Sequence, residues 1–224
     1  KENYSPTYPG AVSIFVSSTN KLSKYKNNVT IYGSTSYKKK LSTNYVNIEL
    51  KKKILRSQSK DYVSKFLEIQ KNINPDIIEI HNRPIYVEKL VQLKTNLVLY
   101  FHNDPITMKG AKTIDERINL LKNVDKIIFI SEWVKNRYFK DLPIISDNKT
   151  DIIYHSIDPI KKIHKKNKQI IFVGKLNESK GYDLCCKSMF KILDNNKDWK
   201  ALSIGEEKRF QNFNTHKNHF NLGQ

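Results

Sequence analysis

The chain has 224 residues, of which 38% are hydrophobic and 28% are charged, and its formal net charge is +18. This composition is typical of a globular protein, and no run of about 18 apolar residues is present to form a transmembrane helix. No apolar stretch follows Lys1 and Glu2, which argues against a signal peptide. The adjacent Cys185 and Cys186 exclude a disulfide scaffold and a cysteine-based zinc site, and they fit a reducing compartment.

The basic charge points to an acidic partner, which could be nucleic acid, an anionic membrane face or a phosphorylated small molecule. Arg accounts for five of the 40 basic residues, and the remainder are Lys. Surfaces that read bases favour Arg, because its planar fork matches guanine edges and phosphates. We therefore do not expect nucleic acid to be the partner.

Short apolar runs predict strands, and amphipathic stretches between them predict helices. In chain order, the predicted strands cover residues 29–33, 45–49, 76–80, 96–101, 126–130, 151–154, 169–173 and 199–204. Residues expected on buried helix faces are Ala11, Ile14, Phe15, Ser18, Leu22 and Tyr25; Tyr62, Val63, Phe66, Leu67 and Ile73; Ile114, Ile118 and Leu121; and Tyr182, Cys185, Cys186, Met189, Phe190 and Leu193. Thr113 and Glu116 form a capping box at the start of the third helix.

Strands that alternate with helices predict an α/β fold with a parallel sheet and right-handed crossovers. The best internal boundary begins at Ser156, where Pro159 and a run of lysines interrupt the pattern. We therefore expect a first domain over residues 1–156, a linker over 157–168, and part of a second domain over 169–224. A domain usually has about 100–150 residues, so the second sheet is expected to continue beyond Gln224.

Polar residues follow several predicted strands, and ligands of open α/β sheets bind beyond the carboxyl ends of strands. In chain order these residues are His81, Asn82 and Arg83; His102, Asn103 and Asp104; and Ser131 and Glu132. Two strand-end histidines, each followed by Asn, favour a functional cleft. We expect no metal there, because the spacing of ligands does not complete a site. The other histidines are interpreted as loop residues; they are His155, His164, His216 and His219.

A further strand end, Gly174-Lys175, is followed by Ser179-Lys180-Gly181. We expect Ser179 to cap the next helix, so that its free N–H groups and the two lysines could hold a diphosphate. The pattern matches neither a Walker A loop nor a dinucleotide-binding loop. Two solvated lysines beside a capped helix remain the alternative. No G-x-S-x-G elbow is present to support a hydrolase.

Five segments resemble motifs of the family-4 glycosyltransferases, which are retaining enzymes of the GT-B fold, and most closely a bacterial subgroup linked to lipopolysaccharide and surface polysaccharides. In chain order the segments are residues 5–11 (SPTYPGA), 76–84 (DIIEIHNRP), 100–110 (YFHNDPITMKG), 124–134 (VDKIIFISEWV) and 172–181 (FVGKLNESKG). Their order matches that of the family over nearly the whole chain.

The resemblance implies two Rossmann-like domains, an acceptor-side one followed by a donor one. It implies transfer of a sugar, with retention, from a nucleotide-diphosphate sugar to a glycan or lipid-linked acceptor, without cofactor or metal. His102 matches a catalytic strand-end His near the reacting sugar. The positions matching the donor diphosphate site are Gly10, Gly174, Lys175 and Lys180.

The chain departs from the family pattern at both ends. Only Lys1-Glu2-Asn3 precedes the glycine loop, and no E-x7-E pair occurs, since Glu206 and Glu207 are adjacent. We therefore expect a fragment of a longer enzyme, in the cytoplasm and in peripheral contact with an anionic inner membrane. The alternative is a non-catalytic basic module that docks on anionic membrane or nucleic acid.

Overall fold

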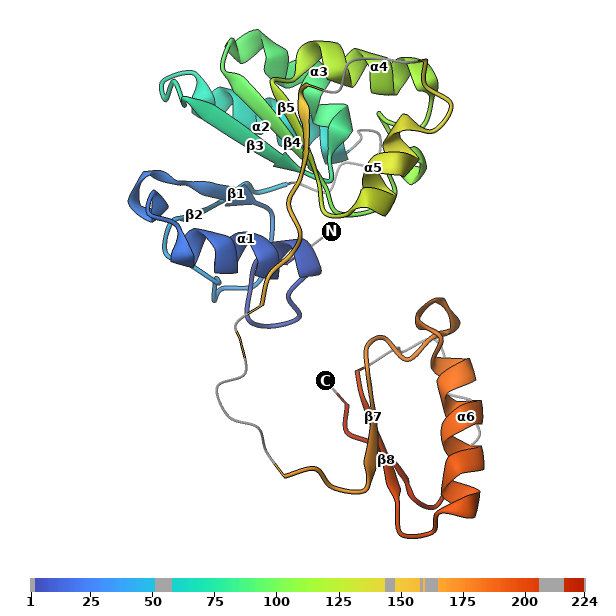
Figure 1. Ribbon diagram of the computed structural model, residues 1–224. Helices are drawn as coiled ribbons and strands as arrows, with labels where there is room; N and C mark the ends of the chain where they lie inside the picture. The colour runs from blue at the N-terminus through green and yellow to red at the C-terminus, as the bar shows by residue number, and fades with distance from the viewer. Residues whose placement is uncertain are drawn as a thin grey trace. The chain divides into compact units, whose positions relative to one another are not determined.

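A computed structural model describes residues 3–50, 58–143, 148–157, 159, 165–205 and 216–223. The chain divides into two compact units, Lys1–Ile157 and Asp158–Gln224 (Figure 1). Part of the expected linker, residues 158 and 160–164, lies outside the described residues, as do His164, Glu206 and Glu207.

The first unit contains a four-stranded parallel sheet in the order β3-β4-β5-β6. Its strands are β3 (Ile77–His81), β4 (Asn96–Phe101), β5 (Lys126–Phe129) and β6 (Thr150–Ile152). Its α-helices are α2 (Gln58–Gln70), α3 (Val87–Leu90), α4 (Ile114–Asn123) and α5 (Glu132–Phe139). Short 3-10 turns are η2 (Pro84–Tyr86), η3 (Val91–Leu93) and η4 (Pro105–Thr107). The predicted parallel α/β architecture is confirmed.

The alternation of side chains along the strands divides the sheet into two different faces. One face carries Leu99, Phe101, Ile127 and Phe129, which are completely buried in the main core. The opposite face of β3 and β4 presents partly exposed residues, among them His81 and Tyr100. The core therefore anchors the strands from one side, and the other side remains available for polar groups.

The polypeptide before this sheet forms α1 (Ala11–Leu22), the 3-10 turn η1 (Lys26–Asn28) and a parallel pair, β1 (Ile31–Gly33) and β2 (Tyr45–Asn47). The expected inward face of α1 is partly wrong, because Ile14 is 49% and Leu22 is 78% exposed. The helix ends at Leu22, so Tyr25 lies outside it and is 60% exposed. The residue of α1 that is buried is the small Ser13.

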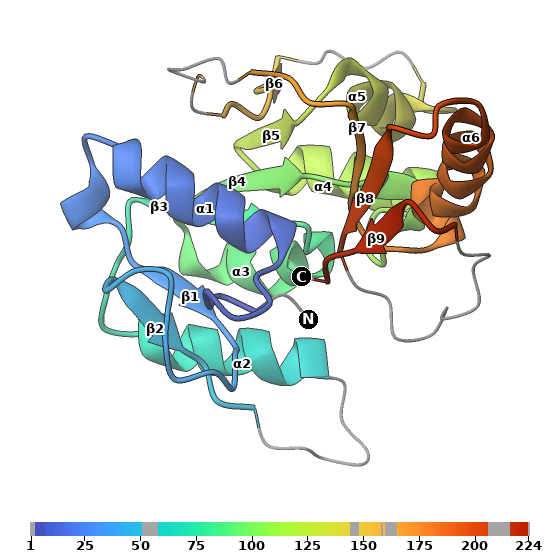
Figure 2. The same ribbon diagram turned by 90° about the horizontal axis from the view of Figure 1, so that it is seen from below.

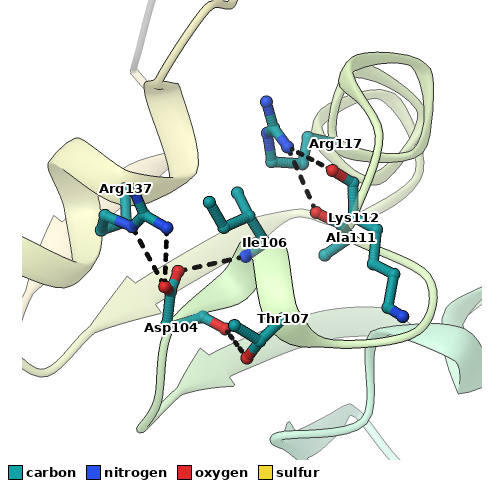
Figure 3. A network of polar contacts seen from close by, with 7 residues as sticks. All are labelled: Asp104, Ile106, Thr107, Ala111, Lys112, Arg117 and Arg137. Atoms are coloured by element: carbon teal, nitrogen blue, oxygen red, sulfur yellow. Dashed lines mark hydrogen bonds and ion pairs between the residues drawn. The ribbon is translucent and has the colours of Figure 1, made fainter.

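The predicted capping box at α4 is confirmed. The Thr113 hydroxyl accepts from the Glu116 backbone N–H at 3.1 Å, and the Glu116 carboxylate accepts from the Thr113 N–H at 3.2 Å. Ile114, however, is 40% exposed rather than inward, and Arg117 is buried with Leu120 and Leu121. The Arg117 guanidinium is tolerated there because it donates to the backbone carbonyls of residues 111, 112 and 140, two of which appear in Figure 3.

The second unit is a three-stranded parallel sheet, β7 (Gln169–Val173), β8 (Lys200–Ile204) and β9 (His219–Asn221), with helix α6 (Tyr182–Asn195). Figure 2 shows the three strands side by side with α6 next to them. The predicted stripe of α6 is confirmed, because Tyr182, Cys186, Met189 and Leu193 form the core and its other two members pack against it. Strand β9 was missed, since its residues His219-Phe220-Asn221 lack the run of β-branched and apolar residues that marked the other strands.

Two glycines bring the ends of β7 and β8 into close backbone contact. Gly174 has a φ of +152° and Gly205 a φ of +144°. The Gly174 N–H donates to the Ile204 carbonyl at 2.9 Å, and a Cβ on Gly205 would lie 1.8 Å from the Gly174 oxygen. No side chain fits at position 205 unless the backbone moves.

We predict that Gly205→Ala destabilises the second unit by at least about 3 kcal/mol, because backbone must shift to accept the methyl group. Gly181→Ala is the matched control: its φ is also positive, at +70°, but a Cβ there meets nothing within 4 Å. The control should lose about 1–2 kcal/mol from the left-handed conformation alone. Urea unfolding followed by Trp199 fluorescence in a Trp133→Phe background measures both, and equal losses would contradict the close-contact argument.

Candidate active site

Three histidines form a hydrogen-bonded chain in the first unit. His81 Nδ1 lies 3.0 Å from His102 Nε2, and His102 Nδ1 lies 3.1 Å from His155 Nε2. His81 ends β3, His102 follows β4, and His155 follows β6. The carboxyl ends of parallel strands meet at one edge of a sheet, and this edge brings the predicted pair together and adds His155.

Asn82 fixes the position of His102. Its backbone is left-handed, with a φ of 52°, a conformation that Asn tolerates better than most residues. This turn directs Asn82 Oδ1 to the His102 backbone N–H, at 2.8 Å, while the Asn82 N–H donates to the Tyr100 carbonyl at 2.9 Å. Asn82 and His102 are both buried, so these bonds replace contacts with water.

Aromatic rings pack around the histidines. Phe15 of α1 stacks on His155, with ring centroids 4.4 Å apart, and meets His102 edge-on at 5.0 Å. Tyr100 stacks on His81 at 4.8 Å. In Figures 1 and 2, α1 lies beside the strands that carry these rings. The apolar packing limits the orientations that the imidazole rings can adopt.

Burial keeps the central histidine neutral. Burial, together with the neighbouring His81 and His155 that would repel an added charge, lowers the pKa of His102 to about 3. Burial also lowers the pKa of His155. At neutral pH His102 therefore has one N–H and one lone pair, each directed at another histidine.

The other predicted residues of this edge have varied surroundings. Arg83 is exposed and donates to the Asn82 carbonyl at 2.8 Å, and Asn103 and Glu132 are exposed as well. Asp104 Oδ2 pairs with Arg137 Nη2 at 2.9 Å and Oδ1 accepts from the Ile106 N–H at 3.3 Å (Figure 3). Ser131 caps α5 by accepting from the Val134 N–H at 3.3 Å. Asp104 and Ser131 thus stabilise local structure, and their predicted role in a cleft stays a prediction.

In the second unit, the residues predicted to bind an anion follow β7 as expected, but the capping of the next helix differs from the prediction. Gly174 and the exposed Lys175 follow β7, and the exposed Lys180 ends the 3-10 turn η5 (Glu178–Lys180). Ser179 does not cap α6, because its hydroxyl donates to Asn177 Oδ1 at 2.8 Å and the helix begins after Gly181. Gly181 provides no side-chain cap, and the Tyr182 N–H donates to the Asn177 carbonyl at 3.2 Å, so the N–H groups further into the first turn of α6 are those suited to an anion.

Gly10, the other residue assigned to the diphosphate, lies in the first unit. It precedes α1 as its N-cap, where its carbonyl accepts from the Ile14 N–H at 3.0 Å. Its backbone is extended, with a φ of −81° and a ψ of 156°. Its predicted diphosphate role stays a prediction.

Sequence reasoning missed the contribution of His155 and Phe15. His155 was interpreted only as a loop residue, although it follows a predicted strand as the other two histidines do. Phe15 was assigned to a helix face, and its ring in fact touches all three histidines. The available signal was the strand-end position shared by the histidines.

The described part of the chain has neither a metal-binding cluster nor a helix able to span a membrane. No group of three or more His, Cys, Asp or Glu side chains in this part of the chain is arranged to hold a metal ion. None of the described helices combines the length and apolar character needed to cross a membrane.

Comparison with known proteins places the fold. No protein-family model matches the chain. A curated protein of Bacillus subtilis (strain 168), "Putative glycosyltransferase YtcC", is 28% identical over 144 residues, which are 55% of this chain and 35% of that protein. The matched part therefore spans about a third of the relative's length.

The fold of the chain also resembles that of solved structures. The structure of Anabaena Alr3699/HepE in complex with UDP-glucose has a TM-score of 0.64 at 11% identity, over 100% of this chain and 67% of that one. TarM has a TM-score of 0.52 at 13% identity, over 75% and 36%. The chain has a glycosyltransferase fold of the GT-B type. At these identities the likeness to the solved structures establishes the fold alone.

We predict that Asn82→Ala destabilises the first unit by about 2–4 kcal/mol, because it leaves the buried His102 N–H unsatisfied and strains the left-handed backbone. Asn82→Asp keeps both the acceptor and the tolerance of this conformation, and should lose less than about 1 kcal/mol. Asn82→Gly keeps only the conformation and should fall between them. Urea unfolding read from Trp133 in a Trp199→Phe background measures the series, and equal stability of the Ala and Asp variants would refute the proposed role.

Proposed function

We propose that the chain is part of a glycosyltransferase that moves a sugar from a nucleotide-diphosphate sugar to a glycan or lipid-linked acceptor. The observation that carries the proposal is the position of the polar groups in the two units. In each parallel sheet they gather at the carboxyl edge, where ligands of α/β folds bind. The first unit has the three histidines there, and the second has Gly174 and Lys175.

The second unit is the proposed donor side. Breaking a glycosidic bond to a diphosphate leaves negative charge on the departing oxygen. Lys175, Lys180 and the uncapped start of α6 are groups that stabilise such a charge without a metal, and we propose that none is required. The complex of HepE with UDP-glucose supports a nucleotide-sugar as the donor class.

The finer assignment rests on the five family-like segments. They support membership of family 4, retention of configuration, and a place in the synthesis of lipopolysaccharide or another surface polysaccharide. In this proposal His102 is the histidine of the reacting centre, and His81, Asn82 and Arg83 belong to the acceptor side.

We predict that Lys175→Ala and Lys180→Ala, each made in the full-length enzyme, lower nucleotide-sugar turnover by about 10²–10³-fold, because each removes a contact worth about 2–4 kcal/mol in the transition state. Turnover is measured with UDP-glucose and GDP-mannose as probes. Lys187→Ala, an exposed lysine of α6, is the matched control and should stay within about twofold of the parent, or under about 0.5 kcal/mol.

The double variant separates shared from independent action. If both lysines hold one anion, the combined loss will be smaller than the sum of the single losses. Single variants that stay within about threefold of the parent, or under 1 kcal/mol, would remove this site from the proposal.

A basic surface in the first unit supports peripheral contact with an anionic membrane. No Asp or Glu occurs between Glu2 and Glu49. Within this segment Lys21, Lys24 and Lys26 are exposed next to Leu22 and Tyr25, which are 78% and 60% exposed. Cations beside exposed apolar side chains suit the headgroup region of an anionic leaflet, where each basic residue adds roughly 1 kcal/mol.

We predict that a variant with Lys21, Lys24 and Lys26 changed to Glu loses at least about tenfold in partitioning onto anionic vesicles, because three attractive charges are reversed. The matched control reverses Lys187, Lys191 and Lys197 of the second unit, which are also exposed, and should lose far less. Sedimentation with phosphatidylglycerol and with phosphatidylcholine vesicles measures both. Equal binding of the parent protein to the neutral vesicles would contradict the proposed contact with an anionic membrane.

A further inference from the structure

We propose that Trp133 is the platform on which a pyranose ring of the acceptor glycan stacks, and that Arg137 and Asp104 hold the indole ring in place for it. The binding of a sugar ring is argued from the geometry and charge of this corner of the first unit. That the sugar belongs to the acceptor rests on the function proposed above.

Trp133 lies at the carboxyl edge of the first unit's sheet, where ligands of α/β folds bind. Strand β5 ends at Phe129, Ser131 caps the following helix, and Trp133 belongs to the first turn of α5. Strand β4 pairs with β5, and His102 follows β4 at the same edge. The indole is therefore carried by the chain that follows the strand next to the one leading into His102.

The side chain of Trp133 contributes little to the core. It is 58% exposed, whereas Val134 and Tyr138 of the same helix are buried in the core of the first unit. Trp is highly buried on average in folded proteins, because its large apolar surface is unfavourable in water. Helix α5 is already anchored by its other residues. A large apolar ring at a ligand-binding edge suits a ligand that has an apolar face.

Two residues fix the plane of the indole. Arg137, one turn later in α5, places its guanidinium carbon 5.7 Å from the indole centroid, within range of a cation–π attraction. Nε and Nη2 of this guanidinium donate to Asp104 Oδ2 at 3.0 Å and 2.9 Å (Figure 3). The pair is partly buried, so moving the guanidinium away would leave a carboxylate without its partner. One face of the indole is thus backed by Arg137, and the large exposed fraction leaves the opposite face open.

The polar groups around the indole suit a ligand with many hydroxyl groups. Nη1 of Arg137 makes no hydrogen bond within the part of the chain that the structure describes, and this side chain is 28% exposed. Asn103 and Glu132 present an exposed amide and an exposed carboxylate at the same edge. Such groups donate to hydroxyls and accept from them, while the negative face of an aromatic ring attracts the C–H groups of a pyranose. Together they match a sugar ring, which has an apolar face and a polar rim.

The local charge argues against a ligand that carries phosphates. The chain has a net charge of +18, yet around the indole Asp104 and Glu132 offset Lys135 and Arg137. A polyanion such as nucleic acid gains its affinity from unbalanced cations, which this corner lacks. A nucleotide base would also stack on an indole, but the proposed donor site belongs to the second unit. A neutral pyranose of the acceptor is therefore the occupant.

Trp133 in this inference positions the acceptor and takes no part in making or breaking bonds. Asp104 follows His102 by two residues, so their Cα atoms are at most about 7 Å apart. A glycan whose end lies at His102 therefore has its next ring near this corner. Holding that ring reduces the freedom that the acceptor must lose before it reacts. The role is independent of which group receives the acceptor's proton, so it is compatible with retention.

Binding is tested on the 224-residue chain with the methyl glycosides of glucose, galactose, mannose and N-acetylglucosamine, using saturation-transfer NMR. At least one glycoside should bind, and Trp133→Ala should weaken its binding at least about tenfold, or about 1.4 kcal/mol. Trp133→Phe keeps an aromatic face and should lose about threefold or less. Ile73→Ala is the matched control, because it removes a side chain that is 50% exposed before β3, at the opposite edge of the sheet, and it should bind as the parent does.

Arg137→Lys tests how the indole is held. It keeps the positive charge but loses the planar fork that pairs with Asp104, so it should weaken glycoside binding by about threefold or more. Binding equal to the parent's in Arg137→Lys would contradict the role of Arg137. Equal binding by the parent and Trp133→Ala, or no binding of any of the four glycosides, would overturn the sugar platform. Uridine monophosphate binding that depends on Trp133 in place of glycoside binding would overturn it as well.

The role in transfer is tested in the full-length enzyme, with UDP-glucose and GDP-mannose as donors and the glycoside that binds best as acceptor. Trp133→Ala should raise the KM for the acceptor at least about tenfold with kcat within about threefold, because uniform binding is lost. Trp133→Phe should restore most of the loss. A lower kcat with an unchanged KM would contradict a positioning role. A parent enzyme that transfers no sugar would refute the proposed function, while glycoside binding still decides whether Trp133 is a sugar platform.

Discussion

The hydrogen bond from the His102 backbone N–H to Asn82 Oδ1 is the constraint on which the first unit's site depends. It joins the turn after β3 to the residue after β4, and the neighbouring bond from the Asn82 N–H to the Tyr100 carbonyl joins them again. A buried N–H without a partner is costly, so the two strand ends stay in register and their imidazole rings stay within hydrogen-bonding distance. The left-handed turn at Asn82 makes this possible, because it aims a short side chain back at the next strand.

In the second unit, the strand ends are joined by close backbone contact at two residues that have no side chain. Gly174 and Gly205 let the backbones of β7 and β8 approach more closely than any side chain would permit. Gly174 and the start of α6, which has no side-chain cap, lie close in sequence to Lys175 and Lys180. One edge therefore presents imidazoles held by packed rings, and the other presents backbone donors and cations.

The histidines differ in how deeply they are buried, and this difference separates their roles. The ring with the most strongly lowered pKa, His102, has both nitrogens occupied, so its two neighbours fix its orientation. The exposed ring of His155 comes from the segment after β6, and Phe15 of α1 stacks on it. Contacts from four separate parts of the first unit thus meet at one imidazole chain, which explains why a single strand-end motif reveals only part of it.

Features that depend on neighbouring residues could be predicted from the sequence alone. Strands 96–101 and 169–173, the capping box of α4 and the apolar stripe of α6 were predicted from periodicity and capping chemistry, because these signals repeat within a few residues. Which side chains meet could be seen only in the folded chain. It brought His155 to His102 across 53 residues of chain, paired Asp104 with Arg137, turned α1 so that Ile14 and Leu22 face outward, and started α6 after Gly181 instead of at Ser179. These outcomes depend on how separate elements pack against one another, and no local pattern in the sequence encodes that packing.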